Sequence, residues 1–469
     1  MLLLNNYNLK ISIKCTYIIL ILSFALHQYF SFLIPFRGVD TTLYSLIGKS
    51  IFEGQNFNII PFEHKPLGAS LIYGFFGELI KYGHGQSQII AIFFNLIFLV
   101  LGILFINLNK LDKQKKITNK IFTLFVCLIV FHAPFVKFQG NTESIINVFI
   151  GFSIICLFIG TEKKNSVICI LLSGILAVFS LNINFLSGPI LFFPSIYLIL
   201  KSKIIKKYVV FFYYSFGILI GCLIIYFFFK ITHNDILSYY FEIFLFLEKY
   251  ASLETLKTRF RTLLYFSQWL IIFIPIIIYI LLKHNTLKNL FENKRVVVLI
   301  LWTFAAFITI LTSGRSFNHY FSLVVAPIVI ISSIELLKIK LRQSIIIFVV
   351  PMLTCLTYFA LDFYSIYIEH NEFYSKNGYY DQLKKLEEVV EDKPVISLKA
   401  GPIHHYLFDM DIHQRYIFPS HTRILYGNQE DNYWLKLVNK KYEYIIVSKS
   451  YCFDDSLYLS CNKLYALYE

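Results

Sequence analysis

Three ionisable residues stand at the edges of apolar segments in the first third of the chain. Asp40 follows the first apolar run, Lys65 precedes a proline, and Glu143 opens a later run. Ionisable groups at a membrane boundary are costly and are frequently functional. A carboxylate there can deprotonate an attacking hydroxyl or amine, and a lysine can bind a phosphate. Simpler interpretations are a helix N-cap for Asp40, headgroup contact for Lys65 and helix-dipole compensation for Glu143.

Two later segments between apolar runs carry further polar residues, namely Arg259 and Arg261 in the first and Arg315, His319 and Tyr320 in the second. Arginines at such places can clamp a phosphate, and they equally serve to solvate a loop. Arg315 or His319 can contact a substrate headgroup. The alternative is that His319 and Tyr320 belong to an aromatic belt at the membrane interface.

The composition defines the environment in which these residues act. The chain has 469 residues, of which 57% are hydrophobic and 15% charged, and the mean hydropathy is +0.62. An ordinary soluble domain has about 25% charged residues. A soluble enzyme, a disordered protein and a collagen-like chain are therefore excluded, and a polytopic membrane protein is expected. The net charge of +14 does not indicate nucleic acid, because the Lys and Arg residues cluster in short loops between apolar runs.

Apolar runs near the ~20 residues needed to cross a bilayer predict about 11 transmembrane helices. They lie at about 15–35, 87–107, 119–137, 143–160, 165–182, 187–201, 208–229, 262–282, 296–313, 320–337 and 343–363. No small-residue cleavage site follows the first run, which favours a membrane anchor over a signal peptide.

The loop charges predict the orientation. With a cytoplasmic N-terminus, every inner loop is rich in Lys and Arg, as the positive-inside rule requires. The outer segments are then 36–86, 138–142, 183–186, 230–261, 314–319 and the chain after about 364. All the candidate residues fall on this one outer face, in the cytoplasmic (inner or plasma) membrane.

The first outer loop, 36–86, contains two apolar stretches. The stretch 41–53 has its apolar residues on one helical face, which predicts a short helix lying in the membrane interface. The stretch 66–82 is apolar and Gly-rich, and we interpret it as interfacial or re-entrant, because a span there would invert every later loop. The transmembrane catalytic domain is expected to cover 1–363.

The polar tail, 364–469, predicts a small extracytoplasmic α/β domain. Its expected elements are a helix at 381–391, strands at 394–399 and 443–448, and a helix at 430–440. Cys452 and Cys461 are close enough in sequence to form a disulfide if the compartment is oxidising. The chain has no cysteine–histidine spacing for structural zinc, no Walker A motif and no GxGxxG, so nucleotide-driven chemistry is not expected.

The quoted residues resemble the GT-C glycosyltransferases. The run Asp40-Thr-Thr-Leu-Tyr44, then Phe52-Glu-Gly54 and His64-Lys65-Pro66, is similar to their first outer loop. The nearest branch is that of the protein O-mannosyltransferases and bacterial lipid A aminoarabinose transferases. Asn141-Thr-Glu143 resembles the second acid-bearing loop, and Gly314-Arg315 with His319-Tyr320 resembles a later stretch. The similarity extends over about residues 10–340 and is best in the first 160.

This resemblance implies an enzyme that transfers a sugar from a polyprenyl- or dolichyl-phosphate to a glycan, lipid or protein acceptor on the outer face. Asp40 would be the general base, Glu143 would position the acceptor, and Lys65 would hold the donor phosphate. Tyr44 and His64 would contact the substrate. The chain departs from the family at Thr41, where many relatives carry a second acid, and at His64, where the aminoarabinose branch has Glu. The implied mechanism requires no nucleotide and no covalent nucleophile, and a divalent metal is compatible with the site.

Two other functions are compatible with an outer-face membrane site. A flippase for isoprenoid-linked sugars would show paired halves and broken spans near the midplane, which this sequence lacks. An O-antigen polymerase would place its large outer loop at 230–261, which is short for that role. The transferase is therefore the favoured hypothesis.

Overall fold

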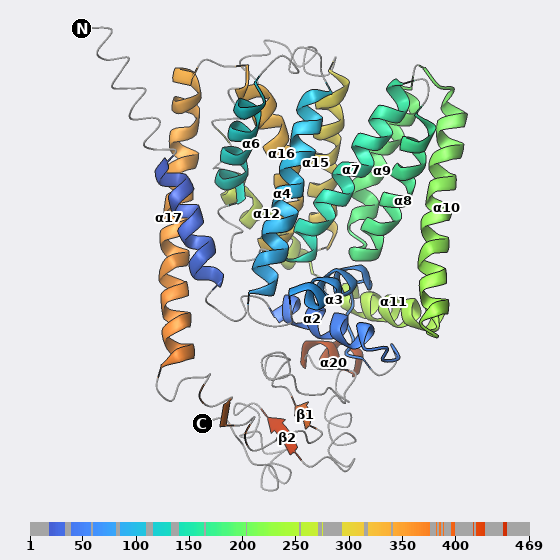
Figure 1. The fold of residues 1–469 in the computed structure, drawn as a ribbon, viewed down its shortest axis with the longest axis vertical. Helices are drawn as coiled ribbons and strands as arrows, with labels where there is room; N and C mark the ends of the chain where they lie inside the picture. Colours follow the sequence, from blue (N-terminus) through green and yellow to red (C-terminus); the bar gives the residue numbers. More distant parts are fainter. Residues whose placement is uncertain are drawn as a thin grey trace, which may run out of the picture. The chain divides into compact units, whose positions relative to one another are not determined.

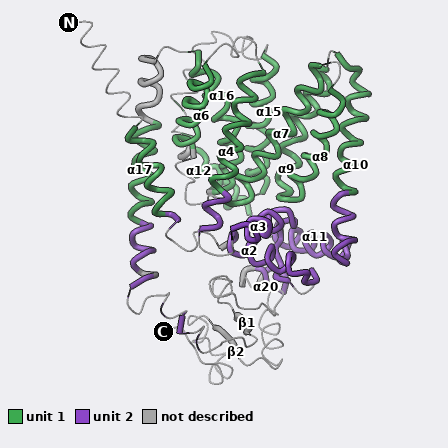
Figure 2. The backbone as a smooth tube through the Cα atoms, viewed as in Figure 1, with its two compact units in different colours: residues 1–30, 91–223, 254–364 green, residues 31–90, 224–253, 365–469 purple. Residues whose placement is uncertain are grey.

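The computed structural model describes part of the chain. The described residues are 18–32, 39–57, 60–80, 85–108, 116–132, 140–163, 166–202, 204–252, 255–270, 274, 293–313, 318–338, 341–375, 381, 384–385, 388, 395–398, 416, 419–426 and 444–447. The chain forms two compact units (Figure 2). Unit 1 comprises 1–30, 91–223 and 254–364, and unit 2 comprises 31–90, 224–253 and 365–469.

Unit 1 is built from helices that run side by side, most of them long and apolar (Figure 1). They are Ile18–Phe32, α4 (Gln86–Asn107), α6 (Ile117–His132), α7 (Thr142–Glu162), α8 (Val167–Ile183), α9 (Ser187–Leu200), α10 (Lys207–Ile231), α12 (Leu256–Leu270), α15 (Lys294–Ser313), the short η3 (Asn318–Phe321), α16 (Ser322–Leu336) and α17 (Leu341–Tyr374). The helices α4, α10 and α17 each continue into unit 2.

These helices confirm a polytopic α-helical membrane protein. Among the described residues, five segments are long and apolar enough to cross a membrane, namely α4, α7, α10, α15 and His319–Leu336. Helices are the expected solution, because a lipid-exposed backbone must satisfy its own hydrogen bonds. Ten of the predicted spans coincide with helices. The total of about 11 remains a prediction, since much of the span expected at 262–282 lies outside the described residues.

Small polar residues hold the helices of unit 1 close together. Ser153 of α7 and Ser173 of α8 each donate a hydroxyl hydrogen bond to the other's carbonyl oxygen, at 2.9 and 2.7 Å. Small residues allow such close helix approach in apolar surroundings. His27 and Asp362 pair between the first helix and α17. The α7–α8 pair fixes the two helix ends that carry Glu143 and Asn184.

Unit 2 contains two short helices from the segment 36–86, α2 (Val39–Phe52) and α3 (Gly68–Ile80), which pack on each other. With 14 and 13 residues, each is roughly 20 Å long, too short for a hydrocarbon core of about 30 Å. The predicted helix at 41–53 is thereby confirmed, and the stretch 66–82 does form a short helix. Their placement in the membrane interface remains a prediction.

The segment 230–261 is largely helical, and its interpretation as a loop was wrong. It contains α11 (Ile236–Ser252) and the beginning of α12. In α11, the side chains of Tyr239, Ile243 and Phe246 are buried, at the i, i+4, i+7 spacing of one helical face. This periodicity lies within a segment that also carries many charged residues.

The tail contributes two strands and one helix to the described part of unit 2. Strands β1 (Val395–Leu398) and β2 (Tyr444–Val447) pair in parallel, with Val395 opposite Tyr444. Both predicted strands are thus confirmed. Positions 381, 384, 385 and 388 are helical, as expected, and α20 (Pro419–Tyr426) packs on α11. The expected helix at 430–440 and the cysteines Cys452 and Cys461 lie outside the described residues, and the α/β domain as a whole remains a prediction.

The crossing of α2 and α3 depends on glycines. A Cβ at Gly48 would overlap backbone atoms of Ser70 and Gly74. Backbone atoms cannot move aside as a flexible side chain can. We expect Gly48→Ala to separate the two helices and to destabilise unit 2 by about 1–3 kcal/mol, measured as a lower thermal midpoint in detergent. Gly188→Ala serves as the control, because its Cβ would approach only Leu181 Cδ2, at 3.0 Å. Equal midpoints for the two variants would contradict this account.

Candidate active site

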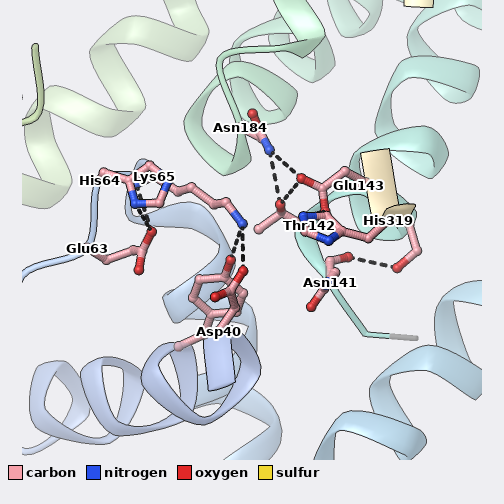
Figure 3. Close-up of polar contacts among 11 residues, drawn as sticks. Asp40, Glu63, His64, Lys65, Asn141, Thr142, Glu143, Asn184 and His319 are labelled. Atoms are coloured by element: carbon pink, nitrogen blue, oxygen red, sulfur yellow. Dashed lines mark hydrogen bonds and ion pairs between the residues drawn. The ribbon is translucent and has the colours of Figure 1, made fainter. Parts of the chain in front are cut away.

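Lys65 is the centre of a polar cluster in unit 2. Its side chain is buried, with Nζ 3.3 Å from Asp40 Oδ2 and donating a 2.5 Å hydrogen bond to the hydroxyl of Tyr44 (Figure 3). Asp40 and Tyr44 stand one turn apart on α2, so they present their side chains to the same side. The Asp40 side chain is 41% exposed. The cluster therefore holds a buried cation beside a carboxylate that remains accessible.

These positions argue against the simpler interpretations of both residues, whose functional roles remain predictions. Asp40 lies in the first turn of α2 and its carboxylate faces Lys65, which does not fit a simple N-cap. Lys65 points to Asp40 and Tyr44 and is buried, which does not fit a side chain that reaches outward to headgroups. The predicted site residues Asp40, Tyr44 and Lys65 are thus brought together within unit 2.

Glu63 and His421 adjoin this cluster, and the sequence analysis missed both. Oε1 of Glu63 accepts a hydrogen bond from the backbone N–H of Lys65 at 3.2 Å and lies 2.8 Å from His64 Nδ1. Burial favours the neutral acid, but the positive charges of His64, His421 and Lys65 outweigh it and lower the pKa of Glu63 to about 2.

His421 is itself buried in the same cluster. Burial lowers the pKa of His421 to about 4, although the Glu63 charge opposes this shift. Ligand atoms of Glu63, His64 and His421 all lie within 4.8 Å of one another, which makes these residues candidates for holding a metal ion. Glu63 could have been noticed beside His64-Lys65. His421 lies in α20, and no motif in the sequence connects it with residues 63–65.

His64 occupies a defined aromatic setting. Its ring is stacked on Phe246 and Tyr250 of α11, with centroids 5.2 and 5.7 Å apart and interplanar angles of 29° and 28°. The ring plane is therefore fixed by packing. The predicted role of His64 in substrate contact remains untested.

Glu143 is the centre of a second polar cluster, in unit 1. Its side chain is fully buried in the first turn of α7. Oε1 accepts hydrogen bonds from Thr142 Oγ1 and Asn184 Nδ2, both at 3.0 Å (Figure 3). Oε2 has no hydrogen-bond partner among the described residues and lies 4.0 Å from His319 Nε2. One oxygen is held in place while the other is available to a ligand, which is more than helix-dipole compensation requires.

His319 and Tyr320 differ in their surroundings. His319 of η3 is placed beside Glu143, and its ring packs edge-on against Tyr320 at 4.7 Å. Tyr320 is only 7% exposed, so its ring does not form part of an exposed interface belt. The contact of either residue with a substrate remains a prediction.

The three predicted phosphate-binding arginines are not placed in either polar cluster by the described residues. Arg259 and Arg261 are exposed on α12, and the guanidinium of Arg261 donates hydrogen bonds to the Tyr265 hydroxyl at 3.0 and 3.2 Å. Arg315 lies outside the described residues. Phosphate binding by these residues remains a prediction.

Asn184 is a further site residue that the sequence analysis missed. It stands at the C-terminus of α8, where Nδ2 donates to both Thr142 Oγ1 and Glu143 Oε1 at 3.0 Å. Its Oδ1 accepts the backbone N–H of Leu186, also at 3.0 Å. Asn184 therefore fixes the orientation of the Glu143 carboxylate. A lone Asn in a short outer turn was the signal available in the sequence.

We expect Asn184→Ala to lower the sugar transfer that the GT-C resemblance implies about tenfold and to cost about 1–3 kcal/mol of stability, because the buried Oε1 of Glu143 keeps Thr142 but loses the other of its two hydrogen-bond partners. The initial rate in proteoliposomes and the thermal midpoint are the measurements. Gln55→Ala is the control, since that amide makes a 3.4 Å surface contact with Glu53. Wild-type behaviour of both variants would show that Asn184 does not hold Glu143.

The described helices and the two acid-bearing clusters define a polytopic membrane protein with polar sites at helix ends. Among solved structures, the chain is similar to ArnT from Cupriavidus metallidurans, crystallised bound to undecaprenyl phosphate. The TM-score is 0.57 at 10% sequence identity, over 96% of this chain and 96% of that chain. The fold resemblance to the aminoarabinose transferase branch of GT-C is therefore confirmed. No family model matches the sequence, and no curated protein matches it.

Proposed function

We propose that the chain is an integral membrane glycosyltransferase that moves a sugar from a polyprenyl-phosphate donor to an acceptor on the outer face of the cytoplasmic membrane. The observation that carries this proposal is Lys65, buried against Asp40 and Tyr44, in a chain whose fold resembles ArnT bound to undecaprenyl phosphate. A polyprenyl phosphate needs a cation at its headgroup and a surrounding bilayer. Lys65 can supply the cation, and the apolar helices place the chain in a bilayer.

The chemistry assigns a role to each residue of the unit 2 cluster. The bond between the anomeric carbon and the phosphate oxygen breaks, and the phosphate leaves with the bonding electrons. The Lys65 ammonium stabilises that developing negative charge. Asp40 takes the proton of the acceptor hydroxyl or amine as it attacks from the opposite side, which inverts the anomeric configuration. The exposure of Asp40 leaves it accessible to the acceptor.

For Glu143, in unit 1, the role implied by the family resemblance is to position the acceptor. Oε2 can accept a hydrogen bond from a substrate hydroxyl or amine, while Asn184 and Thr142 hold Oε1. Glu143 is thus proposed to position the acceptor, with His319 nearby. The proposed acceptor is a glycan, a lipid or a protein. The proposed sugar is a hexose or a pentose.

The decisive experiment follows lipid-linked sugars by mass spectrometry in membranes with and without the protein. A transferase consumes the polyprenyl-phosphate sugar and releases the bare polyprenyl phosphate, and the mass gained by the acceptor identifies the sugar. If the carrier remains glycosylated and only changes leaflet, the protein is a flippase and the proposal fails.

A further inference from the structure

We propose that Glu63, His64 and His421 form a binding site for a divalent transition-metal ion of the zinc class. The site fastens the segment that carries Lys65 to helix α20 of the C-terminal region. The inference concerns unit 2 alone and does not depend on the transferase reaction.

The three side chains converge on one point. Their ligand atoms lie within 4.8 Å of one another, although His421 comes from a distant part of the sequence. Oε1 of Glu63 lies 2.8 Å from Nδ1 of His64, yet this nitrogen makes no hydrogen bond of normal geometry with any described residue. Two ligands of one tetrahedral zinc ion, with bonds of about 2.0–2.1 Å, stand roughly 3.3 Å apart, so small side-chain rotations would let both atoms face a common ion.

The surroundings hold these ligands in fixed orientations. The His64 ring packs against both Phe246 and Tyr250, which also pack on each other, and the rings of Phe246 and Phe62 stand edge-on to His421 at 5.0 and 5.5 Å. Glu63 Oε1 also accepts the backbone N–H of Lys65. Metal ligands are commonly oriented by hydrogen bonds and enclosed by an apolar wall. The aromatic wall of this cluster provides the same restraint.

The donor set selects the class of ion. Two imidazole nitrogens and one carboxylate oxygen suit zinc and its neighbours in the first transition series, whereas calcium and magnesium prefer oxygen ligands alone. Three protein ligands leave a fourth position to water or to another group, as in zinc sites with two histidines and one glutamate. A buried carboxylate beside two imidazoles is also well compensated by a divalent cation.

A metal ion bound here would link two segments that are far apart in the sequence. Glu63 and His64 directly precede Lys65, and His421 lies in α20, which packs on α11. A bound ion would therefore tie the segment of Glu63 and His64 to α20 and restrict the position of the Lys65 backbone. The C-terminal region would then contribute to the site in the first outer loop through a metal bond.

The test measures metal content rather than sugar transfer. The full-length protein in detergent is equilibrated with Zn²⁺, passed over a chelating resin and analysed by inductively coupled plasma mass spectrometry. We expect about one zinc per wild-type chain and at least a tenfold lower content for Glu63→Gln and for His421→Ala. His370→Ala is the matched control, because His370 packs on Tyr374 outside the cluster, and it should retain the metal.

A second measurement guards against variants that do not fold. Cobalt-substituted wild type should show the visible absorption of four-coordinate Co²⁺, and His421→Cys should retain cobalt and add a thiolate charge-transfer band. A wild-type zinc content no higher than that of Glu63→Gln, or a cobalt spectrum unchanged in His421→Cys, would overturn the proposal. If the protein binds zinc but transfers no sugar, the metal-site proposal holds and only the proposed transferase function fails.

Discussion

Asp40→Asn is expected to lower the turnover number for sugar transfer by about 10²–10⁴-fold, the usual range for loss of a general base. The amide has the size of the carboxylate but cannot take the acceptor proton. The KM for the donor should stay the same or fall, because Lys65 loses a competing anion 3.3 Å away. The measurement is the initial rate of polyprenyl-phosphate release in proteoliposomes at varied donor concentration.

Two further variants make this result specific. Asp40→Glu should recover part of the rate, since it restores a carboxylate at a slightly different position. Asp235→Asn is the control, because that exposed carboxylate caps the start of α11 through Leu237 and Ser238, and it should transfer sugar at nearly the wild-type rate. Near-normal turnover by a folded Asp40→Asn protein would remove Asp40 from the role of base.

Lys65→Met is expected to reduce kcat/KM for the donor by about 10²–10³-fold, because a buried ammonium that binds the phosphate and stabilises its departure is lost. The apolar chain of methionine fills similar space, so the effect should be one of charge. Lys65→Arg should rescue little, since the larger guanidinium does not fit the 2.5 Å contact with the Tyr44 hydroxyl.

The control for this variant lies on the neighbouring helix. Lys49 of α2 makes an i,i+4 pair with Glu53 at 3.5 Å, and Lys49→Met should leave donor kinetics unchanged. The double variant Asp40→Asn, Lys65→Met should lose less than the sum of the single losses in free energy, because the two side chains are in contact. If the free-energy losses of the two single variants are strictly additive, or if Lys65→Met has a normal KM for the donor, Lys65 does not bind the donor phosphate.

The amino-acid sequence by itself determined the membrane-spanning helices, because an apolar run in a bilayer must form its own backbone hydrogen bonds. Hydropathy was therefore sufficient for α4, α7, α10 and α15. It failed for α11, whose buried face of Tyr239, Ile243 and Phe246 is visible only as a helical periodicity within a charged segment. The candidates Asp40 and Lys65 could be selected because ionisable residues at the membrane boundary are rare and costly.

The tertiary structure alone decided which polar residues meet. Asn184 holds Glu143 from 41 positions away, and His421 of α20 lies against Glu63 and His64 of the first outer loop. Such pairs cannot be predicted from the local sequence, because they form only when distant segments pack and buried polar groups find partners. Hydropathy acts residue by residue and can be read along the chain, whereas hydrogen bonds and metal ligands depend on atoms placed a few ångströms apart by the whole fold.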